Sequence, residues 1–345
     1  MSGLTSISWT DATWNPTRGC SRVSKGCEHC YAERIAARFS GPGLPHEGFA
    51  YVNDSGESSR RHHWTGRVEI VESALDWPLR WRGSEEAREE GRPSRIFVNS
   101  MSDLFHENLS DADIDRVFAV MALARQHTFQ VLTKRAERMR QFVSENYVPI
   151  PNVWLGVSVE DQTTADERIP LLLQTPAAVR FVSYEPALGP VDFTRVDCGT
   201  GETKLEALMG ARPAWAPLDW VIIGGESGPG ARPMHPTWAR SSILQCKAAD
   251  VPVFLKQQGA WQPKLWRDDP TRDRRWGTLD RDGHWYLETT PWNGRQGDDS
   301  ETDELVMIHV GGHGEDWNEW PEDMRVREFP TTDGCDHEWQ RKRAR

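Results

Sequence analysis

Residues 95–103 have the sequence RIFVNSMSD, in which a short apolar run ends in a polar cluster. The pattern recurs in TFQVLTKR (128–135), NVWLGVSVE (152–160), VRFVSYEP (179–186), DWVIIGGES (219–227) and VPVFLKQQG (251–259). Short runs that are apolar throughout are typical of strands buried on both faces, as in a parallel sheet. The pattern therefore predicts an α/β protein built on parallel strands.

Helical segments lie between these runs. Ser110, with Asp113 three residues later, resembles a capping box in front of IDRVFAVMALARQ (114–126). ADERIPLLLQ (165–174) and HPTWARSSILQCKAAD (235–250) supply further crossovers. Strands that alternate with helices indicate βαβ units with right-handed connections. With one more strand expected at SISWT (6–10), we predict about six to seven parallel strands in a full or partial (β/α) barrel.

A barrel is favoured over an open sheet because each later strand ends in polar side chains. In a barrel these ends converge on one face, where active sites are built. The alternative is that such residues only begin ordinary polar surface loops. The residues concerned are Asp103, Lys134, Arg135, Glu160, Glu185, Glu226, Lys256 and Gln257.

The domain prediction follows from where this repeat stops. Residues 1–260 are expected to form a barrel-like catalytic domain with insertions near 40–66 and 194–218. Residues 261–345 lack clear periodicity and hold many of the 17 tryptophans. They are expected to form an irregular, Trp-rich C-terminal extension packed on the barrel.

Composition narrows the class of protein. No apolar run is long enough to span a membrane, and the N-terminus lacks the basic stretch and apolar core of a signal peptide. A cytoplasmic protein without membrane contact is therefore expected. The net charge is −11, so nucleic acid could be bound only through a local basic patch. The C-terminal RKRAR is basic but is predicted to be a solvated tail.

Three of the six cysteines are clustered. Cys20, Cys27 and Cys30 form a C-x6-C-x2-C arrangement, followed by a predicted helix, YAERIAARF (31–39). Such clustering indicates metal or redox chemistry, and Cys30 at a helix N-terminus would have its thiolate stabilised by backbone N–H groups. Cys246, within a predicted helix, is expected to be a buried apolar residue.

Three cysteine thiolates are compatible with two kinds of metal centre. A structural zinc site normally has four protein ligands, and His29 or His106 could supply the fourth. A [4Fe–4S] cluster held by three cysteines instead leaves one iron open for substrate or cofactor.

The run DATWNPTRGCSRVSKGCEHCYAERIAAR resembles the signature of a phage and bacterial three-cysteine-motif family of unknown function. Later blocks, including NSMSDLFHE, VLTKRAERM and IIGGESGPGARPM, extend the resemblance over roughly residues 5–260. That family is similar to radical S-adenosylmethionine (SAM) enzymes, whose usual motif is C-x3-C-x2-C and whose GGE triplet follows an early strand. Here the first gap is six residues and the GGE triplet lies late.

The resemblance implies a radical SAM-type enzyme of the cytoplasm, or of the host cytoplasm if the protein is phage-encoded. It would use a [4Fe–4S] cluster, SAM and an electron donor such as ferredoxin or flavodoxin. A nucleic acid or nucleotide is the favoured substrate. The alternative is a zinc- or cluster-bearing nucleic-acid-binding phage protein without catalysis.

The resemblance also implies roles for single residues. Tyr31 would pack beside the cluster or adenine, and the polar groups after the second strand would bind the methionine end of SAM. The Gly-rich late turn would approach adenine or a phosphate, or is a simple turn. Acids and bases at strand ends would line the substrate mouth, or form structural ion pairs. In that order, the candidates are Tyr31; Asn99, Ser100, Ser102 and Asp103; Gly224, Gly225 and Glu226; and Glu160, Glu185 and Lys256.

Overall fold

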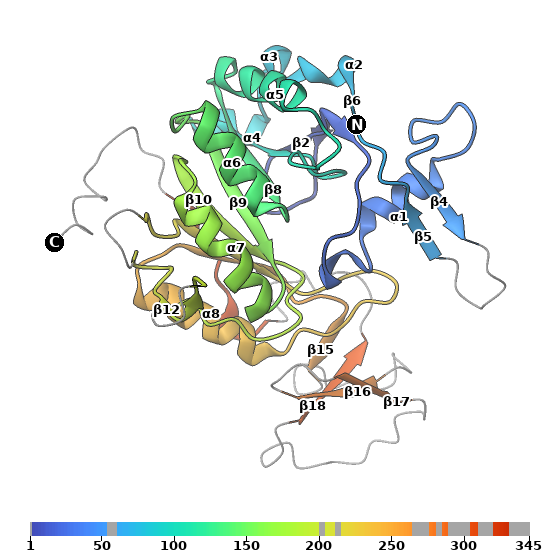
Figure 1. The fold of residues 1–345 in the computed structure, drawn as a ribbon. Coiled ribbons are helices and arrows are strands. Elements are labelled where there is room, and N and C mark those ends of the chain that lie inside the picture. Colours follow the sequence, from blue (N-terminus) through green and yellow to red (C-terminus); the bar gives the residue numbers. More distant parts are fainter. Residues whose placement is uncertain are drawn as a thin grey trace. The chain divides into compact units, whose positions relative to one another are not determined.

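The computed structural model describes residues 2–53, 61–199, 204–210, 215–263, 276–280, 285–288, 304–309 and 320–330. The chain divides into two compact units. Unit 1 comprises residues 1–158, 175–179 and 228–230, and unit 2 comprises 159–174, 180–227 and 231–345. Figure 1 gives the labels of the elements, which are described below unit by unit.

Unit 1 is built on parallel strands joined by helices. Strands β2 (Ala12–Trp14), β7 (Ser94–Val98), β8 (His127–Thr133) and β9 (Val153–Val159) are parallel neighbours in that order. Strand β1 (Gly3–Leu4) pairs antiparallel with β2. Helix α5 (Asp111–Leu123) connects β7 to β8, and α6 (Ala136–Asn146) connects β8 to β9. Short helices α2 (Glu72–Leu75), α3 (Trp77–Arg80) and α4 (Glu85–Glu89) precede β7.

The segment between β2 and these short helices carries the cysteines. Strand β3 (Thr17–Arg18) pairs with β6 (Glu69–Ile70), and a 3-10 turn, η1 (Lys25–Cys27), leads into helix α1 (Tyr31–Arg38). Strands β4 (Ala50–Asn53) and β5 (Arg61–Trp64) then form an antiparallel hairpin. The predicted insertion near 40–66 therefore contains regular structure.

Unit 2 continues the alternation of strands and helices. Strands β10 (Val179–Tyr184), β13 (Trp220–Gly224) and β14 (Val253–Gln257) are parallel neighbours in that order. The helices are α7 (Gln162–Gln174) and α8 (Pro236–Ala248). Together with the five strands above, these strands belong to a mostly parallel eight-stranded sheet. The predicted α/β class is therefore confirmed.

Smaller pieces complete unit 2. In the predicted insertion near 194–218, β11 (Val196–Asp197) pairs antiparallel with β12 (Lys204–Leu205). Strands β15 (Trp261–Pro263), β18 (Glu304–His309), β16 (Trp276–Asp280) and β17 (Trp285–Glu288) form an antiparallel sheet in that order. A 3-10 turn, η4, covers Glu322–Met324. The described part of the Trp-rich extension is thus more regular than expected.

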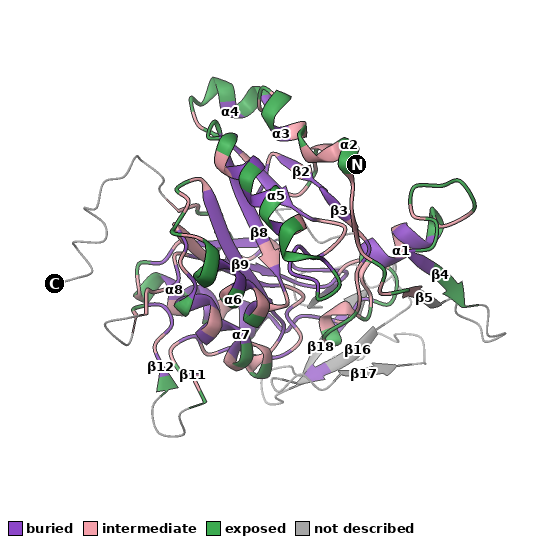
Figure 2. Ribbon diagram, turned by 45° about the horizontal axis from the view of Figure 1, so that its top comes forward, coloured by how far each residue is buried: buried purple, intermediate pink, exposed green. Residues whose placement is uncertain are grey.

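The helix boundaries follow the expected physical chemistry. Ser110 is the N-cap of α5, and its hydroxyl accepts a hydrogen bond from the Asp113 N–H at 3.1 Å. Figure 2 shows β8 and β9 buried along their length, whereas α5 exposes one face. The buried face of α5 includes Ile114, Val117 and Phe118, as its periodicity predicts. Cys246 is fully buried in α8, which confirms its predicted apolar role.

One strand prediction was wrong. Residues 6–10 do not form a strand. They contain a turn in which the Thr10 N–H donates a hydrogen bond to the Ile7 carbonyl at 3.2 Å. The strand is β2, two residues later, because Ala12 and Trp14 are the side chains that are fully buried there. Trp266, Trp292, Trp317 and the RKRAR tail lie outside the described residues. Among the helices that are described, none combines the length and apolar character needed to cross a membrane.

Candidate metal centre

Cys20, Cys27 and Cys30 all lie in unit 1, in the loop between β3 and α1. None of the three forms a disulfide. The 3-10 turn begins where the Cys27 N–H bonds to the Ser24 carbonyl at 3.0 Å, and Cys30 is the N-cap of α1. The predicted placement of Cys30 at a helix N-terminus is therefore confirmed.

The three sulfurs influence one another electrostatically. Burial raises the pKa of the Cys20 thiol to about 12; negative charge at Asp103, Cys30 and Cys27 acts in the same direction, and Arg135 opposes it. Burial also raises the pKa of Cys30, against the effect of the Glu33 and Ala32 backbone N–H groups. Burial thus favours the protonated form of both thiols, and a bound metal would have to displace their protons.

The donor set suits a soft metal ion, because three thiols in one loop are typical ligands of zinc and of iron–sulfur clusters. In the described ranges, however, no three His, Cys, Asp or Glu side chains are arranged closely enough to hold a metal ion. The thiols would therefore have to draw together on binding. Such coupling of metal binding to local ordering is common in small cysteine loops.

A network of charged side chains holds Ser21, the residue that follows Cys20. The Arg135 guanidinium, just after β8, contacts Asp103 at 3.0 Å and Glu107 at 2.7 Å. It also donates a hydrogen bond to the Ser21 Oγ at 2.8 Å. Strand-end residues of β7 and β8 therefore meet, as the barrel argument requires of neighbouring strands, and they fix the start of the cysteine loop.

His106 takes part in this network rather than offering a vacant ring nitrogen. Its Nε2 lies 2.9 Å from the Ser21 Oγ, and its Nδ1 accepts a hydrogen bond from the Asn108 N–H at 3.1 Å. The ring is fully buried, and burial together with Arg135 lowers its pKa. Both nitrogens are engaged, so His106 positions Ser21 and is not arranged as a fourth metal ligand.

The loop after β7 contacts the cysteine loop through several polar groups. The Tyr31 hydroxyl donates a hydrogen bond to the Ser100 carbonyl, and the Ser102 Oγ lies 2.8 Å from the Thr17 Oγ1. Both carboxylate oxygens of Asp103 accept hydrogen bonds. Besides Arg135, the donors are the Thr133 hydroxyl and the Phe105 and Lys134 N–H groups. Its carboxylate therefore holds the loop together.

Asn99 differs from its neighbours. It has a left-handed backbone with φ of 61°, which costs energy for a residue other than glycine. Its side chain is 3% exposed, and neither amide atom has a hydrogen-bond partner. A buried amide without partners is expensive unless a ligand or water satisfies it. Among the predicted cofactor-binding residues, Asn99 is therefore the one whose buried side-chain amide lacks hydrogen-bond partners.

Gly228 and Gly230, at the end of the late GGESGPG turn, belong to unit 1. They lie against the cysteine loop and helix α1. A Cβ atom at Gly230 would lie 3.0 Å from the His29 ring, and one at Gly228 would lie 3.2 Å from the Arg34 guanidinium. Both glycines have positive φ. Gly228 and Gly230 therefore have a backbone and surroundings that favour glycine, and their near neighbours are side chains of this chain. The predicted approach of the turn to adenine or a phosphate stays a prediction.

The remaining predicted residues lie in unit 2 and form ion pairs. Lys256 Nζ contacts Glu185 at 2.6 Å, and Gln257 donates to the same carboxylate oxygen at 3.2 Å. A Cβ atom at Gly224 would lie 3.0 Å from the carboxyl carbon of Glu185. The ends of β10, β13 and β14 therefore converge within this unit.

Two further ion pairs have more deeply buried carboxylates. Glu226 accepts hydrogen bonds from the Arg232 backbone N–H at 2.8 Å and from its guanidinium at 2.7 and 2.9 Å. Glu160 and Arg168, both almost fully buried, approach to 3.2 Å. Of the three carboxylate side chains, that of Glu185 is the most exposed, at 20%, against 7% for Glu226 and 1% for Glu160.

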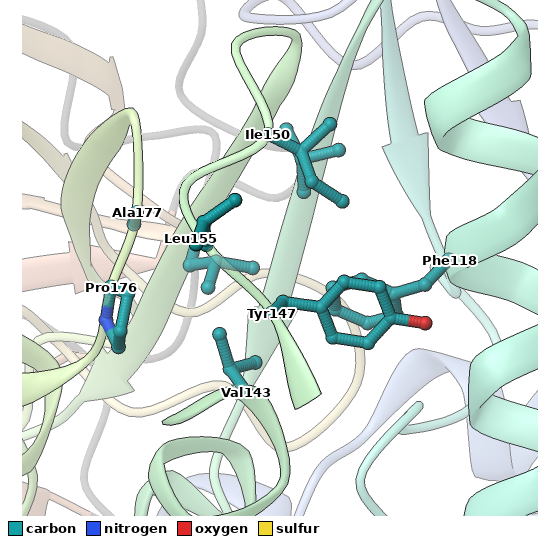
Figure 3. A pocket seen from close by; sticks show the side chains of 9 residues that line it. Phe118, Val143, Tyr147, Ile150, Leu155, Pro176 and Ala177 are labelled. Atoms are coloured by element: carbon teal, nitrogen blue, oxygen red, sulfur yellow. The ribbon is translucent and has the colours of Figure 1, made fainter. Parts of the chain in front are cut away.

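An apolar hollow elsewhere in unit 1 is not part of the centre. It lies between the end of α6 and the start of β9, with Tyr147, Ile150 and Leu155 among its lining side chains (Figure 3). The hydroxyl of Tyr147 bonds to Asp115. The hollow is at the amino end of β9, whereas the cysteine network uses the carboxyl ends of β7 and β8.

Sequence reasoning missed several supporting residues, including Ser21, Arg22, Glu33 and Asn15. Asn15 accepts hydrogen bonds from the Met101 N–H at 3.0 Å and from the Ser100 Oγ at 3.2 Å. No local pattern marks the contacts of Asn15, because its partners lie 85 and 86 positions away in sequence. Of the residues in this network, Arg135 had been expected from the sequence, because it follows the end of a predicted strand.

A family model described as "Protein of unknown function (DUF5131)" matches residues 4–305. No curated protein and no solved structure gives a significant match. The matched range includes all the blocks on which the sequence resemblance rests, and the family description states no activity.

Proposed function

We propose that this chain, which belongs to the DUF5131 family of proteins of unknown function, is an iron–sulfur enzyme of the radical SAM type. In this proposal the parallel strands are those of a radical-SAM-like partial barrel. Cys20, Cys27 and Cys30 hold a [4Fe–4S] cluster, and SAM is cleaved for radical chemistry on a nucleic acid or nucleotide. The observation that carries the proposal is the loop of three free thiols ending at the N-terminus of α1.

Three ligands favour this centre over structural zinc, which normally takes four. His106, one of the two fourth ligands considered, has both ring nitrogens engaged. Backbone N–H groups of Ala32 and Glu33 oppose the rise in the Cys30 pKa, as they would favour a bound thiolate. The bound cluster, reduced by a ferredoxin- or flavodoxin-like donor, would supply the electron that splits SAM into methionine and a 5′-deoxyadenosyl radical.

The chain's own residues would bind and orient SAM. The side-chain amide of Asn99 would donate a hydrogen bond to the SAM carboxylate and accept one from the SAM amino group. These bonds would satisfy the buried amide, which otherwise lacks partners. Ser100 and Ser102 flank the same loop, and Asp103 holds it through Arg135. Tyr31, which donates to the Ser100 carbonyl, would fix the loop against the cysteine helix.

Residues of unit 2 have proposed roles at the substrate. Glu185 and Lys256 would exchange a proton with the substrate radical or its product, because their ion pair is partly accessible. Glu160 is paired with Arg168 in the interior, and its proposed role is to orient the strand end. Gly224, Gly225 and Glu226 would form the turn that approaches adenine or a phosphate.

The activity test is SAM cleavage. Anaerobically reconstituted protein, incubated with SAM and dithionite, should release 5′-deoxyadenosine and methionine in equal amounts. Asn99→Gly should retain the cluster absorbance but lose most of this release, whereas Cys27→Ala should lose both. A protein that carries an intact cluster and releases no 5′-deoxyadenosine would contradict the SAM part of the proposal. Binding of zinc instead would favour a nucleic-acid-binding protein without catalysis.

A further inference from the structure

Two neighbouring residues at the end of β14 contact the same carboxylate in unit 2. Along β13, consecutive residues pair with Leu255 and then Gln257 of β14, so Lys256 is an extra residue in the register, a β-bulge. Neighbours along a regular strand point to opposite faces. At the bulge this alternation is broken, and Lys256 Nζ and Gln257 Nε2 both contact Oε1 of Glu185, at 2.6 and 3.2 Å.

Gly224, at the end of β13, leaves room for this contact. Strand β13 lies between β10 and β14 in the sheet, and a Cβ atom at Gly224 would lie 3.0 Å from the carboxyl carbon of Glu185. The Gln257 amide also donates a hydrogen bond to the Gly225 carbonyl at 2.8 Å. Gln257 is buried and fixed by two hydrogen bonds, so it holds the Glu185 carboxylate in one orientation.

This arrangement engages one oxygen of the Glu185 carboxylate and leaves the other open. Oε1 accepts both hydrogen bonds, whereas Oε2 has no partner among the residues that the structure describes. Lys256 Nζ carries further N–H donors beyond the one that it uses on Oε1. The Glu185 and Lys256 side chains are 20% and 18% exposed. An open acceptor and open donors therefore lie side by side and are partly accessible.

The next residue along the chain, Gln258, has polar atoms that lack partners. It is 2% exposed, and within the described ranges neither atom of its side-chain amide makes a hydrogen bond. Its backbone lies against the turn after β13, since a Cβ atom at Gly225 would lie 2.2 Å from the Gln258 carbonyl oxygen. A buried amide without partners costs free energy unless a ligand or water satisfies it. Independently of the ion pair, Gln258 thus points to a polar ligand at this strand end.

The Glu185–Lys256 pair is suited to a neutral group that donates and accepts hydrogen bonds on one edge. A charged ligand is disfavoured because a further charge would have to be desolvated beside a pair whose charges already balance. A trans peptide directs its N–H and C=O groups to opposite sides, so one peptide unit could not contact both side chains. Cytosine and adenine instead place an amino group beside an accepting ring nitrogen, and carboxylates accept hydrogen bonds from base amino groups.

We propose that Glu185 and Lys256 bind the edge of an aminated nucleobase, and that Gln257 positions the carboxylate for this contact. Glu185 Oε2 would accept a hydrogen bond from the base amino group, and Lys256 Nζ would donate one to the neighbouring ring nitrogen. The inference rests on the proposed function for the reaction that follows binding. It deepens that function by naming the part of the nucleotide that is recognised.

The test is isothermal titration calorimetry of the full chain, without SAM, against cytidine and adenosine monophosphates. We expect saturable binding of at least one of them, whereas ribose phosphate, which lacks the base, should bind at least about tenfold more weakly. Glu185→Gln should weaken nucleotide binding about tenfold, because it breaks the ion pair and alters the accepting group. Asp197→Asn, which breaks an exposed pair with Lys204 in the same unit, should leave binding unchanged.

The positioning role of Gln257 has its own readout. A nucleotide whose base amino group is dimethylated cannot donate, so wild type should prefer the unmodified nucleotide. Gln257→Met keeps the length of the side chain but removes its donor, and it should reduce this preference because the carboxylate loses its fixed orientation. A purely structural loss would weaken the binding of both nucleotides equally and would remove the role of Gln257.

Absence of nucleotide binding, or equal affinities for the nucleotides and ribose phosphate, would overturn the inference. Equal effects of Glu185→Gln and Asp197→Asn would also contradict it. Because SAM is omitted, the result separates the two proposals. A chain that binds nucleotides through Glu185 but never releases 5′-deoxyadenosine keeps this site and loses the enzymatic function. Release without nucleotide binding would keep the enzymatic function and remove the site.

Discussion

Glu33 of α1 holds Arg22, which lies between Cys20 and Cys27, through a two-pronged contact with Nε–O distances of 3.0 and 3.1 Å. The Glu33 carboxylate is 2% exposed. A buried carboxylate of this kind is stable only while its partner remains. The pair therefore makes the shape of the cysteine loop depend on the helix that follows it.

Arg22→Ala should consequently destabilise the protein and loosen the cysteine loop. Glu33 would keep only its bond from the Trp64 N–H, so we expect a loss of about 1–3 kcal/mol in unfolding free energy. Urea unfolding measures this loss, and the iron content after reconstitution should fall with it. Arg80→Ala, which breaks an exposed pair with Asp76, should change stability by less than about 0.5 kcal/mol. Equal effects of the two variants would contradict the role of Glu33.

Asn99→Gly should leave the fold intact or stabilise it while reducing SAM cleavage. Glycine adopts the left-handed backbone of Asn99 at no steric cost, and the unpartnered amide disappears. Asp250 is a matched control, since it is the other residue besides glycine with positive φ among those described. Asp250→Gly should retain full SAM cleavage. If Asn99→Gly also retained it, the amide would have no part in cofactor binding.

Gly230→Ala should impair cluster loading, because the new Cβ atom would lie 3.0 Å from the His29 ring. Gly43→Ala provides the comparison: it has a similar positive φ of 74°, but its Cβ would meet nothing within 4 Å. Both variants carry the same backbone penalty of about 1–2 kcal/mol. Iron content per folded chain should therefore fall only in Gly230→Ala; an equal fall in both would assign the effect to backbone strain.

Asp11 should contribute stability that depends on pH. Burial alone would raise its pKa, but hydrogen bonds from Arg92 and from the Arg95 N–H bring the pKa below its ordinary value. A carboxyl group with a lowered folded-state pKa stabilises the fold above the unfolded pKa, about 3.9, and loses that effect as pH falls through the folded value. The difference in unfolding free energy between wild type and Asp11→Asn should thus be largest near pH 7 and shrink below about pH 4. A difference that is constant with pH would exclude this ion pair as its source.

The sequence was informative wherever local pattern determines structure. The six apolar runs became β7, β8, β9, β10, β13 and β14, because uninterrupted apolar runs of this length are buried on both faces. Ser110 and Cys30 were located correctly because helix N-termini have strong local signals. The strand expected at SISWT was misplaced because so short a segment does not separate a strand from a turn; the strand is β2, at Ala12–Trp14.

The candidate centre was only partly predictable. The thiols could be recognised from spacing, but the hydrogen bond from Arg135 to Ser21 joins residues 114 positions apart, which no local pattern reveals. The β4–β5 hairpin was missed because its strands are four residues long and lie in a polar segment. Its exposed Tyr51–His63 pair became visible only once the register was known.

The most direct test of the central claim is the metal content of anaerobically purified and reconstituted protein. We predict about four irons and about four acid-labile sulfides per chain in the wild type. Cys27→Ala should lose them, and Cys246→Ala, which removes a buried thiol outside the loop, should keep them. One zinc per chain without sulfide, or full cluster content in Cys27→Ala, would contradict the assignment.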